Sequence, residues 1–166
     1  MEFGARVCKP KQALCETCIF NGSCYALAHK SIASLPYKKG KTKVQKRYFN
    51  YFIFLDEANN TIIQQRTAKG IWQGLYEFPL FESDKKASIK TIKAYLKINY
   101  QVEKALLYNE EAIIHKLSHQ HLYTHFWIVK TNSKLSKSIA WNTLNNYPFP
   151  VLIRNFIKKF HPNKNY

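Results

Sequence analysis

Four cysteines stand between positions 8 and 24, and none follows in the rest of the 166-residue chain. Their spacing is Cys8-x6-Cys15-x2-Cys18-x5-Cys24. Four thiolates this close in sequence can converge on one centre, and tetrahedral sulfur coordination suits either zinc or an iron–sulfur cluster. The pattern therefore predicts a small metal-organised module at the front of the chain. Four unrelated buried cysteines are the weaker interpretation, because free cysteines rarely crowd in this way.

The cysteine spacing resembles the [4Fe–4S] loop of the endonuclease III superfamily of DNA glycosylases, and Met1–Ala5 resembles the end of the helix before that loop. This resemblance implies that the four cysteines bind a [4Fe–4S] cluster with a structural and DNA-docking role, with zinc as the alternative. Whether the cluster stays bound to this part of the protein alone is left open. The resemblance also implies phosphate contacts for three basic residues of the loop: Arg6, Lys9 and Lys11.

The segment from Thr67 to Pro79, T-A-K-G-I-W-Q-G-L-Y-E-F-P, is a glycine-punctuated turn that leads into a short strand. Gly70 and Gly74 permit the tight backbone geometry of such a turn. The segment resembles the R-x3-G-x2-x-G-L-W/Y-E-F-P stretch of Nudix-like domains, and in particular of the C-terminal domain of the MutY adenine DNA glycosylases. Taken alone, it is equally compatible with an ordinary core hairpin.

A Nudix hydrolase needs a dense set of glutamates to hold divalent metals beside a pyrophosphate. Here Pro79 is followed by L-F-E-S-D-K-K-A-S-I-K, so that lysines follow Glu82 and Asp84 and the R-E-x2-E-E core is absent. We therefore expect the Nudix-like fold to serve recognition and not metal-dependent hydrolysis.

The segment from Lys116 to Leu122, K-L-S-H-Q-H-L, is predicted to form a turn between two strands. It resembles the Phe-Ser-His loop by which MutY C-terminal domains recognise 8-oxoguanine opposite the target adenine. The resemblance implies that Leu117, Ser118 and His119 contact the lesion, with a leucine where the family has an aromatic residue. A plain turn hydroxyl is the alternative for Ser118.

The chemistry of the lesion suits a serine. Guanine presents N7 and O6 as acceptors on its major-groove edge. Oxidation at C8 turns N7 into an N–H donor and adds a carbonyl acceptor, and the one hydroxyl of Ser118 both donates and accepts. Leu117 can wedge between bases, but without aromatic stacking. A zinc site is less favoured for the nearby histidines, because the turn breaks their register: His115, His119, His121 and His125.

The chain has 26 Lys+Arg against 10 Asp+Glu and a formal net charge of +16. This surplus predicts a polyanionic partner, nucleic acid before anionic membrane. Ten of the basic residues, against two glutamates, fall within the first 47 positions. Residues 31–45, with Pro36 and Gly40, are predicted to be a linker that either lies on phosphates or is a solvated tether. The linker lysines expected at the DNA backbone are Lys38, Lys39, Lys41 and Lys43.

From Val44 onward, alternating strand and helix patterns predict an α+β class. We expect a Nudix-like mixed or antiparallel sheet flanked by helices, preceded by the small four-cysteine loop and the basic linker. Ser83 or Asp84 is the expected N-cap of the first helix. The predicted strands are 47–55 and 61–66, joined as a hairpin by a turn at 56–60, and 110–117 and 122–130; the predicted helices are 87–98 and 151–160.

Three domains follow: 1–30 as the iron–sulfur loop, 31–45 as the linker and 46–166 as a Nudix-like lesion-recognition domain. The resemblance implies the C-terminal part of an adenine DNA glycosylase of base excision repair, an enzyme that flips adenine out of its pair and cleaves the N-glycosidic bond. The family's catalytic acids have no counterpart here, so no catalytic residue is assigned and this part alone is expected to be inactive. The alternatives are a zinc-binding nucleic-acid module and a Nudix nucleotide pyrophosphohydrolase.

The expected partner is double-stranded DNA with an 8-oxoguanine:adenine or guanine:adenine mispair, bound by a monomer. A protein partner at the linker is left open. The N-terminus has no apolar signal region, and the longest apolar stretch, Tyr51–Leu55, is far too short to cross a bilayer. We therefore expect no membrane association and a bacterial, cytoplasmic, DNA-associated protein. In a reducing cytoplasm the four cysteines are expected to be metal ligands and not disulfides.

Overall fold

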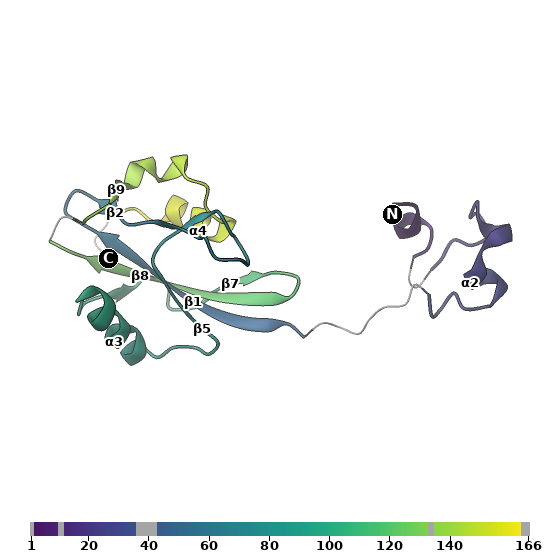
Figure 1. Ribbon diagram of the computed structural model, residues 1–166, viewed down its shortest axis with the longest axis horizontal. Helices are drawn as coiled ribbons and strands as arrows, with labels where there is room; N and C mark the ends of the chain where they lie inside the picture. The colour runs from purple at the N-terminus through teal and green to yellow at the C-terminus, as the bar shows by residue number, and fades with distance from the viewer. Residues whose placement is uncertain (1, 10–11, 36–42, 133–134, 164–166) are drawn as a thin grey trace. The chain divides into compact units, whose positions relative to one another are not determined.

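The computed structural model describes residues 2–9, 12–35, 43–132 and 135–163. The chain divides into two compact units, Met1–Thr42 and Lys43–Tyr166, both drawn in Figure 1. No helix in these described ranges is long and apolar enough to span a membrane.

In residues 2–9 and 12–35, the part of the first unit that the structure describes, the regular elements are three short helical turns: α1 (Glu2–Arg6), η1 (Asn21–Ser23) and α2 (Tyr25–Ala28). None of its side chains that the structure describes is buried, and large apolar groups such as Ile19 and Tyr25 are strongly exposed. A segment this small cannot build a hydrophobic core without a further constraint, and a metal site is a common one.

The second unit is built on a five-stranded mixed sheet in the order β5-β1-β8-β6, with β7 also paired to β8. Its centre is the parallel pair of β1 (Gln45–Leu55) and β8 (Gln120–Lys130). β5 (Leu80–Ser83) runs antiparallel to β1, whereas β6 (Leu106–Leu107) and β7 (Ile113–Lys116) run antiparallel to β8. The mixed sheet of the expected α+β class is confirmed.

β6 and β7 share one edge of β8, and Asn109 fills the gap between them. Its Oδ1 accepts from Phe126 N at 2.8 Å, and its Nδ2 donates to Thr124 O at 3.0 Å. The side chain thus replaces the strand that is missing at this point, so the backbone groups of β8 keep their partners.

The predicted hairpin between 47–55 and 61–66 is wrong. β1 is bonded to β8 along its whole length on one edge and to β5 from Tyr48 to Tyr51 on the other. The chain after the Asp56 turn therefore leaves the main sheet and forms two small ones. In these, β2 (Asn60–Thr61) pairs with β9 (Ile139–Ala140), and β3 (Gln64–Gln65) pairs with β4 (Tyr76–Glu77).

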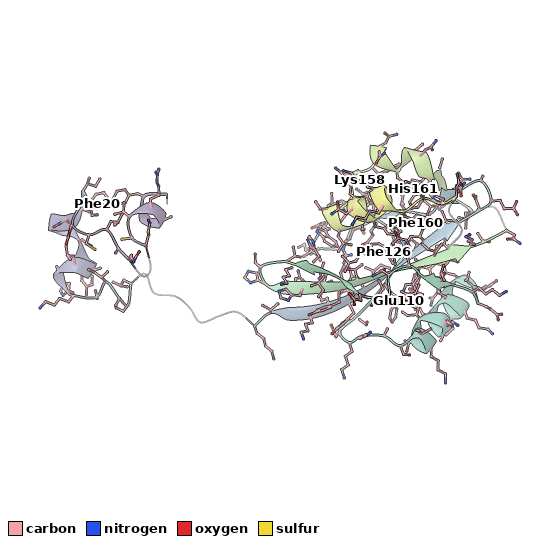
Figure 2. All side chains as sticks on the ribbon, turned by 180° about the vertical axis from the view of Figure 1, so that it is seen from behind. Phe20, Glu110, Phe126, Lys158, Phe160 and His161 are labelled. Carbon is pink, nitrogen blue, oxygen red and sulfur yellow. The ribbon has the colours of Figure 1, made fainter. Side chains whose placement is uncertain are left out.

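The sheet has a helical layer on each face (Figure 1). Helix α3 (Ile89–Tyr100) packs Ile92 and Leu96 against one face. Helix α4 (Val151–Lys159) and η2 (Trp141–Asn146) cover the other face. There Phe156 stacks on Phe126 of β8 at a centroid distance of 4.0 Å. Figure 2 labels Phe126 and also Phe160, which directly follows α4. Alternate residues of β1 and β8 point to the two layers, as a strand requires.

The expected N-cap of the first helix is also wrong. Ser83 ends β5 opposite Tyr48, and α3 begins six residues beyond it, at Ile89. Ser88 is the cap, and its Oγ accepts from Thr91 N at 3.1 Å. The predicted helix at 151–160 is confirmed, and Pro150 stands immediately before its first residue.

Candidate nucleic-acid recognition site

The loop with Leu117, Ser118 and His119 is the tip of the β7–β8 hairpin. Lys116 lies opposite His121, and Leu117 N donates to Gln120 O at 2.9 Å, so Ser118 and His119 are its two loop residues. Both are exposed. Leu117 is half buried and packs against the core on the α4 face. The hydroxyl and the imidazole are thus accessible to an external ligand, and the leucine holds the tip to the domain.

The hairpin tip lies beside the start of β1, where the linker enters the domain. Gln45 N donates to His119 O at 3.0 Å, and Lys43, which is exposed, stands two residues before β1. The structure therefore brings one predicted phosphate contact to the same end of the sheet as Ser118. Arg6 and Lys9 are exposed in the first unit. The remaining predicted contacts lie outside the described residues: Lys11, Lys38, Lys39 and Lys41.

The glycine-punctuated segment, residues 67–79, supports the hairpin on the face of the sheet that α4 covers. Gly70 and Gly74 have positive φ values of 137° and 83°, as a tight turn requires. Trp72 also has a positive φ, 61°, which is unfavourable for a bulky side chain and needs support from tertiary contacts. Its ring lies 5.7 Å from the ring of His115 on β7 and 6.2 Å from that of Phe49. These contacts fix the base of the hairpin.

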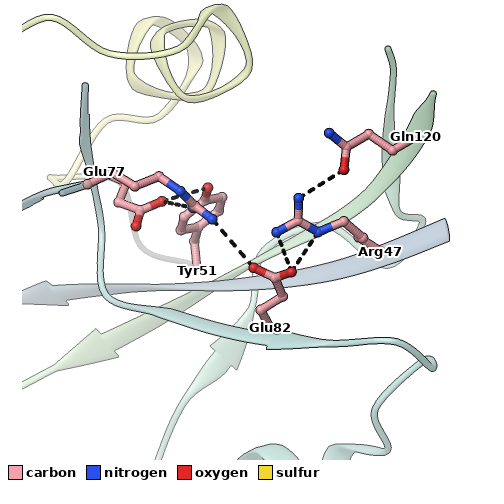
Figure 3. Close-up of polar contacts among 6 residues, drawn as sticks. Arg47, Tyr51, Glu77, Glu82 and Gln120 are labelled. Atoms are coloured by element: carbon pink, nitrogen blue, oxygen red, sulfur yellow. Dashed lines mark hydrogen bonds and ion pairs between the residues drawn. The ribbon is translucent and has the colours of Figure 1, made fainter. Parts of the chain in front are cut away.

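A chain of polar contacts crosses the sheet beside the hairpin (Figure 3). Arg47 Nε donates to Glu82 Oε1 at 2.6 Å, and Arg47 Nη1 donates to Gln120 Oε1 at 2.9 Å. Arg66 Nη1 lies 2.7 Å from Glu77 Oε2, and its Nη2 lies 3.5 Å from Glu82 Oε2. Sequence reasoning missed Arg47 and Gln120, because only the parallel register of β1 and β8 brings them together.

The buried end of this chain is Glu77, which also accepts from the Tyr51 hydroxyl at 3.2 Å. Burial and the neighbouring Glu77 carboxylate raise the pKa of Tyr51 well above its usual value. Burial opposes the charge of Arg66, but the charge of Glu77 and the hydrogen bond to it, together with Tyr51 and Glu82, raise the pKa of the guanidinium. The carboxylates of Glu77 and Glu82 are therefore engaged by arginines and are not presented to a divalent cation.

The four cysteines line one small cavity in the first unit, together with Val7, Leu14 and Leu27. Burial, and then the nearby sulfurs of Cys8, Cys24 and Cys18, raise the pKa of Cys15. In the described parts of the chain, no group of three or more His, Cys, Asp or Glu side chains is placed to hold a single metal ion. Four convergent thiols around a shared cavity suit the donor set of a multi-atom iron–sulfur cluster.

The histidines of the hairpin do not converge. His115 lies opposite Leu122 and contacts Trp72, so it points to the face of the sheet that α4 covers. His121 and His125 alternate with Leu122 and Phe126 along β8 and point to the other face. His125 Nδ1 lies 3.0 Å from Asn109 O. The two-residue turn thus separates these imidazoles.

Comparison with known proteins identifies the family of the second unit. A family model described as NUDIX domain matches residues 50–159. The chain belongs to the NUDIX domain family. The match covers the sheet from the middle of β1 to the last residue of α4. It includes the hairpin tip and the members of the chain of polar contacts other than Arg47, which lies before residue 50.

Two curated relatives are adenine DNA glycosylases of Buchnera aphidicola. One, from the subspecies Schizaphis graminum, is 31% identical over 119 residues, which is 72% of this chain and 33% of the relative. The other, from the subspecies Baizongia pistaciae, is 29% identical over 173 residues, which is 97% of this chain and 47% of the relative. The chain thus spans between a third and a half of the length of these relatives.

Solved structures share the fold of the NUDIX domain. The C-terminal domain of mouse MUTYH, solved in complex with human PCNA, has a TM-score of 0.51 at 14% identity and covers 68% of this chain and 85% of that one. A MutT protein from Methanosarcina mazei Go1 has a TM-score of 0.51 at 11% identity and covers 73% and 95%. The expected Nudix-like fold is confirmed.

Proposed function

We propose that this chain is the C-terminal part of an adenine DNA glycosylase and that its NUDIX domain recognises 8-oxoguanine opposite the adenine that the whole enzyme removes. The observation that carries the proposal is the exposed Ser118 hydroxyl at the tip of a hairpin that Trp72 supports at its base and Leu117 holds at its tip. The two adenine DNA glycosylase relatives support the choice of reaction.

In this proposal Ser118 accepts a hydrogen bond from N7–H of the oxidised base and donates one to the new carbonyl at C8. Unmodified guanine has an acceptor at N7 and no oxygen at C8, so the same hydroxyl can satisfy only one group. His119, beside it, and Lys43, at the start of the domain, supply contacts to the adjacent phosphates. The NUDIX domain thereby adds binding energy that depends on the lesion, while glycosidic bond cleavage takes place in another part of the enzyme.

The cluster is the second part of the proposal. Cys8, Cys15, Cys18 and Cys24 would hold a [4Fe–4S] cluster, which would fix the fold of a unit that has no buried side chain in its described residues. Such a unit would present Arg6 and Lys9 to the DNA backbone in one defined geometry.

Metal analysis tests the cluster. The purified 166-residue chain, expressed with iron and handled without oxygen, is expected to bind iron and sulfide and to absorb visible light. The Cys18→Ser variant is expected to lose most of this iron, because one of four ligands is removed. Stoichiometric zinc without iron would contradict the iron–sulfur assignment and support the zinc alternative.

The lesion contact is tested with the Ser118→Ala variant of the full-length protein and two duplexes that differ only in the oxygen at guanine C8. We expect the preference for the 8-oxoguanine duplex to fall by about tenfold, the effect of losing one good base contact. Ser136→Ala, an exposed serine outside the hairpin, is the matched control and should keep the preference. An unchanged preference in Ser118→Ala would overturn the assignment of the loop.

A further inference from the structure

One face of the sheet is open at the end that carries the hairpin. Because directly opposite residues of paired strands point to the same face, the register defines two neighbouring rows. The first row is Lys116–His121–Lys46 and the second is Ile114–Tyr123–Tyr48–Ser83. We call these two rows the open face.

Helix α3 covers the sheet only beyond the open face. In the next row Asn50 is buried and lies opposite Phe81, whose ring lies 4.7 Å from that of Tyr95 on α3. In the two rows themselves, Lys46, Lys116 and Ile114 are exposed, and Tyr48 and Tyr123 are half buried. The two tyrosines therefore stand at the border between the covered core and solvent.

The two tyrosine rings form one aromatic surface. Their centroids are 5.1 Å apart with 23° between the ring planes. Lys46 Nζ lies 6.0 Å from the centroid of Tyr123, which places a cation directly beside the aromatic pair. Nucleobases of any identity stack on aromatic side chains of this kind, because every base has a π face.

The charge of the open face is complementary to a phosphate backbone. None of its seven side chains is a carboxylate, and the nearby Glu77 and Glu82 are held by arginines on the opposite face. Lys46 and Lys116 flank His121 in the first row. Cations in one row beside aromatic rings in the next match the alternation of phosphates and bases along an unpaired strand.

We propose that the open face binds an unpaired DNA strand, with a base stacked on the Tyr48–Tyr123 pair and phosphates beside Lys46 and Lys116. The choice of DNA over RNA rests on the proposed function. The face also adjoins the lesion contact, since Lys116 is two residues before Ser118. An unpaired strand on this face holds the hairpin tip close to DNA without contributing to lesion specificity.

The test uses the 166-residue chain and a fluorescently labelled oligothymidylate, which contains no lesion. Binding is measured by fluorescence anisotropy over a series of salt concentrations. The Tyr48→Leu/Tyr123→Leu variant is expected to bind about tenfold more weakly, with a nearly unchanged salt slope. Tyr48→Phe/Tyr123→Phe should retain the affinity, because the rings are kept. Equal binding by a folded Leu/Leu variant would overturn the proposal.

The lysines are tested by the salt slope. Lys46→Gln/Lys116→Gln is expected to reduce the slope of log affinity against log salt by about 1.4, since each phosphate contact to a single strand contributes about 0.7. Lys158→Gln/Lys159→Gln removes the same charge from exposed residues of α4 and should change the slope less. Equal reductions in the two variants would show nonspecific attraction and contradict a bound strand on the open face.

A measurement on the unaltered chain keeps the proposal testable if the Tyr48→Leu/Tyr123→Leu variant does not fold. A strand with bromodeoxyuridine is crosslinked by ultraviolet light, and the adduct is located by mass spectrometry. Adducts on Tyr48 or Tyr123 are expected, and adducts confined to other surfaces would overturn the proposal. Ser118→Ala should bind oligothymidylate normally, so failure of the open face and failure of the lesion contact give different results.

Discussion

Glu77 and Glu82 have a structural role in this NUDIX domain, because arginines hold both carboxylates. The side chain of Glu77 is 7% exposed and that of Arg66 is 15% exposed, so each is largely removed from water and depends on the other. A buried ion pair contributes little net stability, but removing one partner leaves an uncompensated charge. This asymmetry makes the pair a sensitive test of the assigned role.

We expect Glu77→Gln to destabilise the domain by about 3 kcal/mol, because Arg66 then retains only Glu82 at 3.5 Å. Tyr51→Phe, which removes one hydrogen bond to the same carboxylate, should cost about 1 kcal/mol. Urea denaturation of the purified chain and of the two variants would measure both changes in the free energy of unfolding. If Glu77→Gln lowered the free energy of unfolding by less than Tyr51→Phe does, Glu77 would not be the main partner of Arg66.

Single residues were predictable where the local sequence decides their environment. Ser118 stands in a polar turn, and its exposure follows from that turn. The sequence leaves open whether Leu117 wedges between bases. The structure places it half buried against the core, a position that depends on the register of β7 and not on the local sequence. Tyr48 and Tyr123 were not singled out, since nothing local indicates that two distant strands place them side by side.

At the scale of elements, the sequence predicts the long periodic segments and the strand that becomes β7, but not the two-residue strands β6 and β9. β1, β8, α3 and α4 each contain many apolar residues with one period, so the pattern identifies them. β6 and β9 have two residues each, which is too short for any period. The failed hairpin after β1 has the same cause as the missed tyrosines: strand pairing is decided by the whole sheet.

The N-cap of α3 gives a prediction at this scale. Ser88→Ala is expected to lower stability by about 1 kcal/mol, because Thr91 N loses its acceptor at the start of the helix. Asp84→Ala alters the exposed alternative cap and should have a much smaller effect. Thermal unfolding of the two variants, followed by circular dichroism, distinguishes them. A larger loss of stability in Asp84→Ala than in Ser88→Ala would mean that the helix begins nearer to Asp84.

For the whole molecule, the hydrophobic cores lie in one of the two units, whereas both units have a net positive charge. The first 42 residues have seven lysines and arginines against two glutamates, but no buried side chain among those that the structure describes. The sheet domain contains the two aromatic and aliphatic cores and eleven of the sixteen net positive charges. Most of the cooperative unfolding transition should therefore belong to residues 43–166, whereas both units contribute to attraction by DNA.

Removal of residues 1–42 tests whether the sheet domain is stable alone and whether both units attract DNA. We expect the melting temperature of the sheet domain to change little, because no apolar core is lost, and the salt slope for binding to unmodified duplex DNA to fall, because phosphate contacts from the first unit are lost. The matched control is the whole chain with its cysteines intact, measured in the same buffers. A large drop in melting temperature would mean that the first unit supports the NUDIX domain. An unchanged salt slope would mean that the DNA contacts lie on the sheet domain alone, at the hairpin tip and the open face.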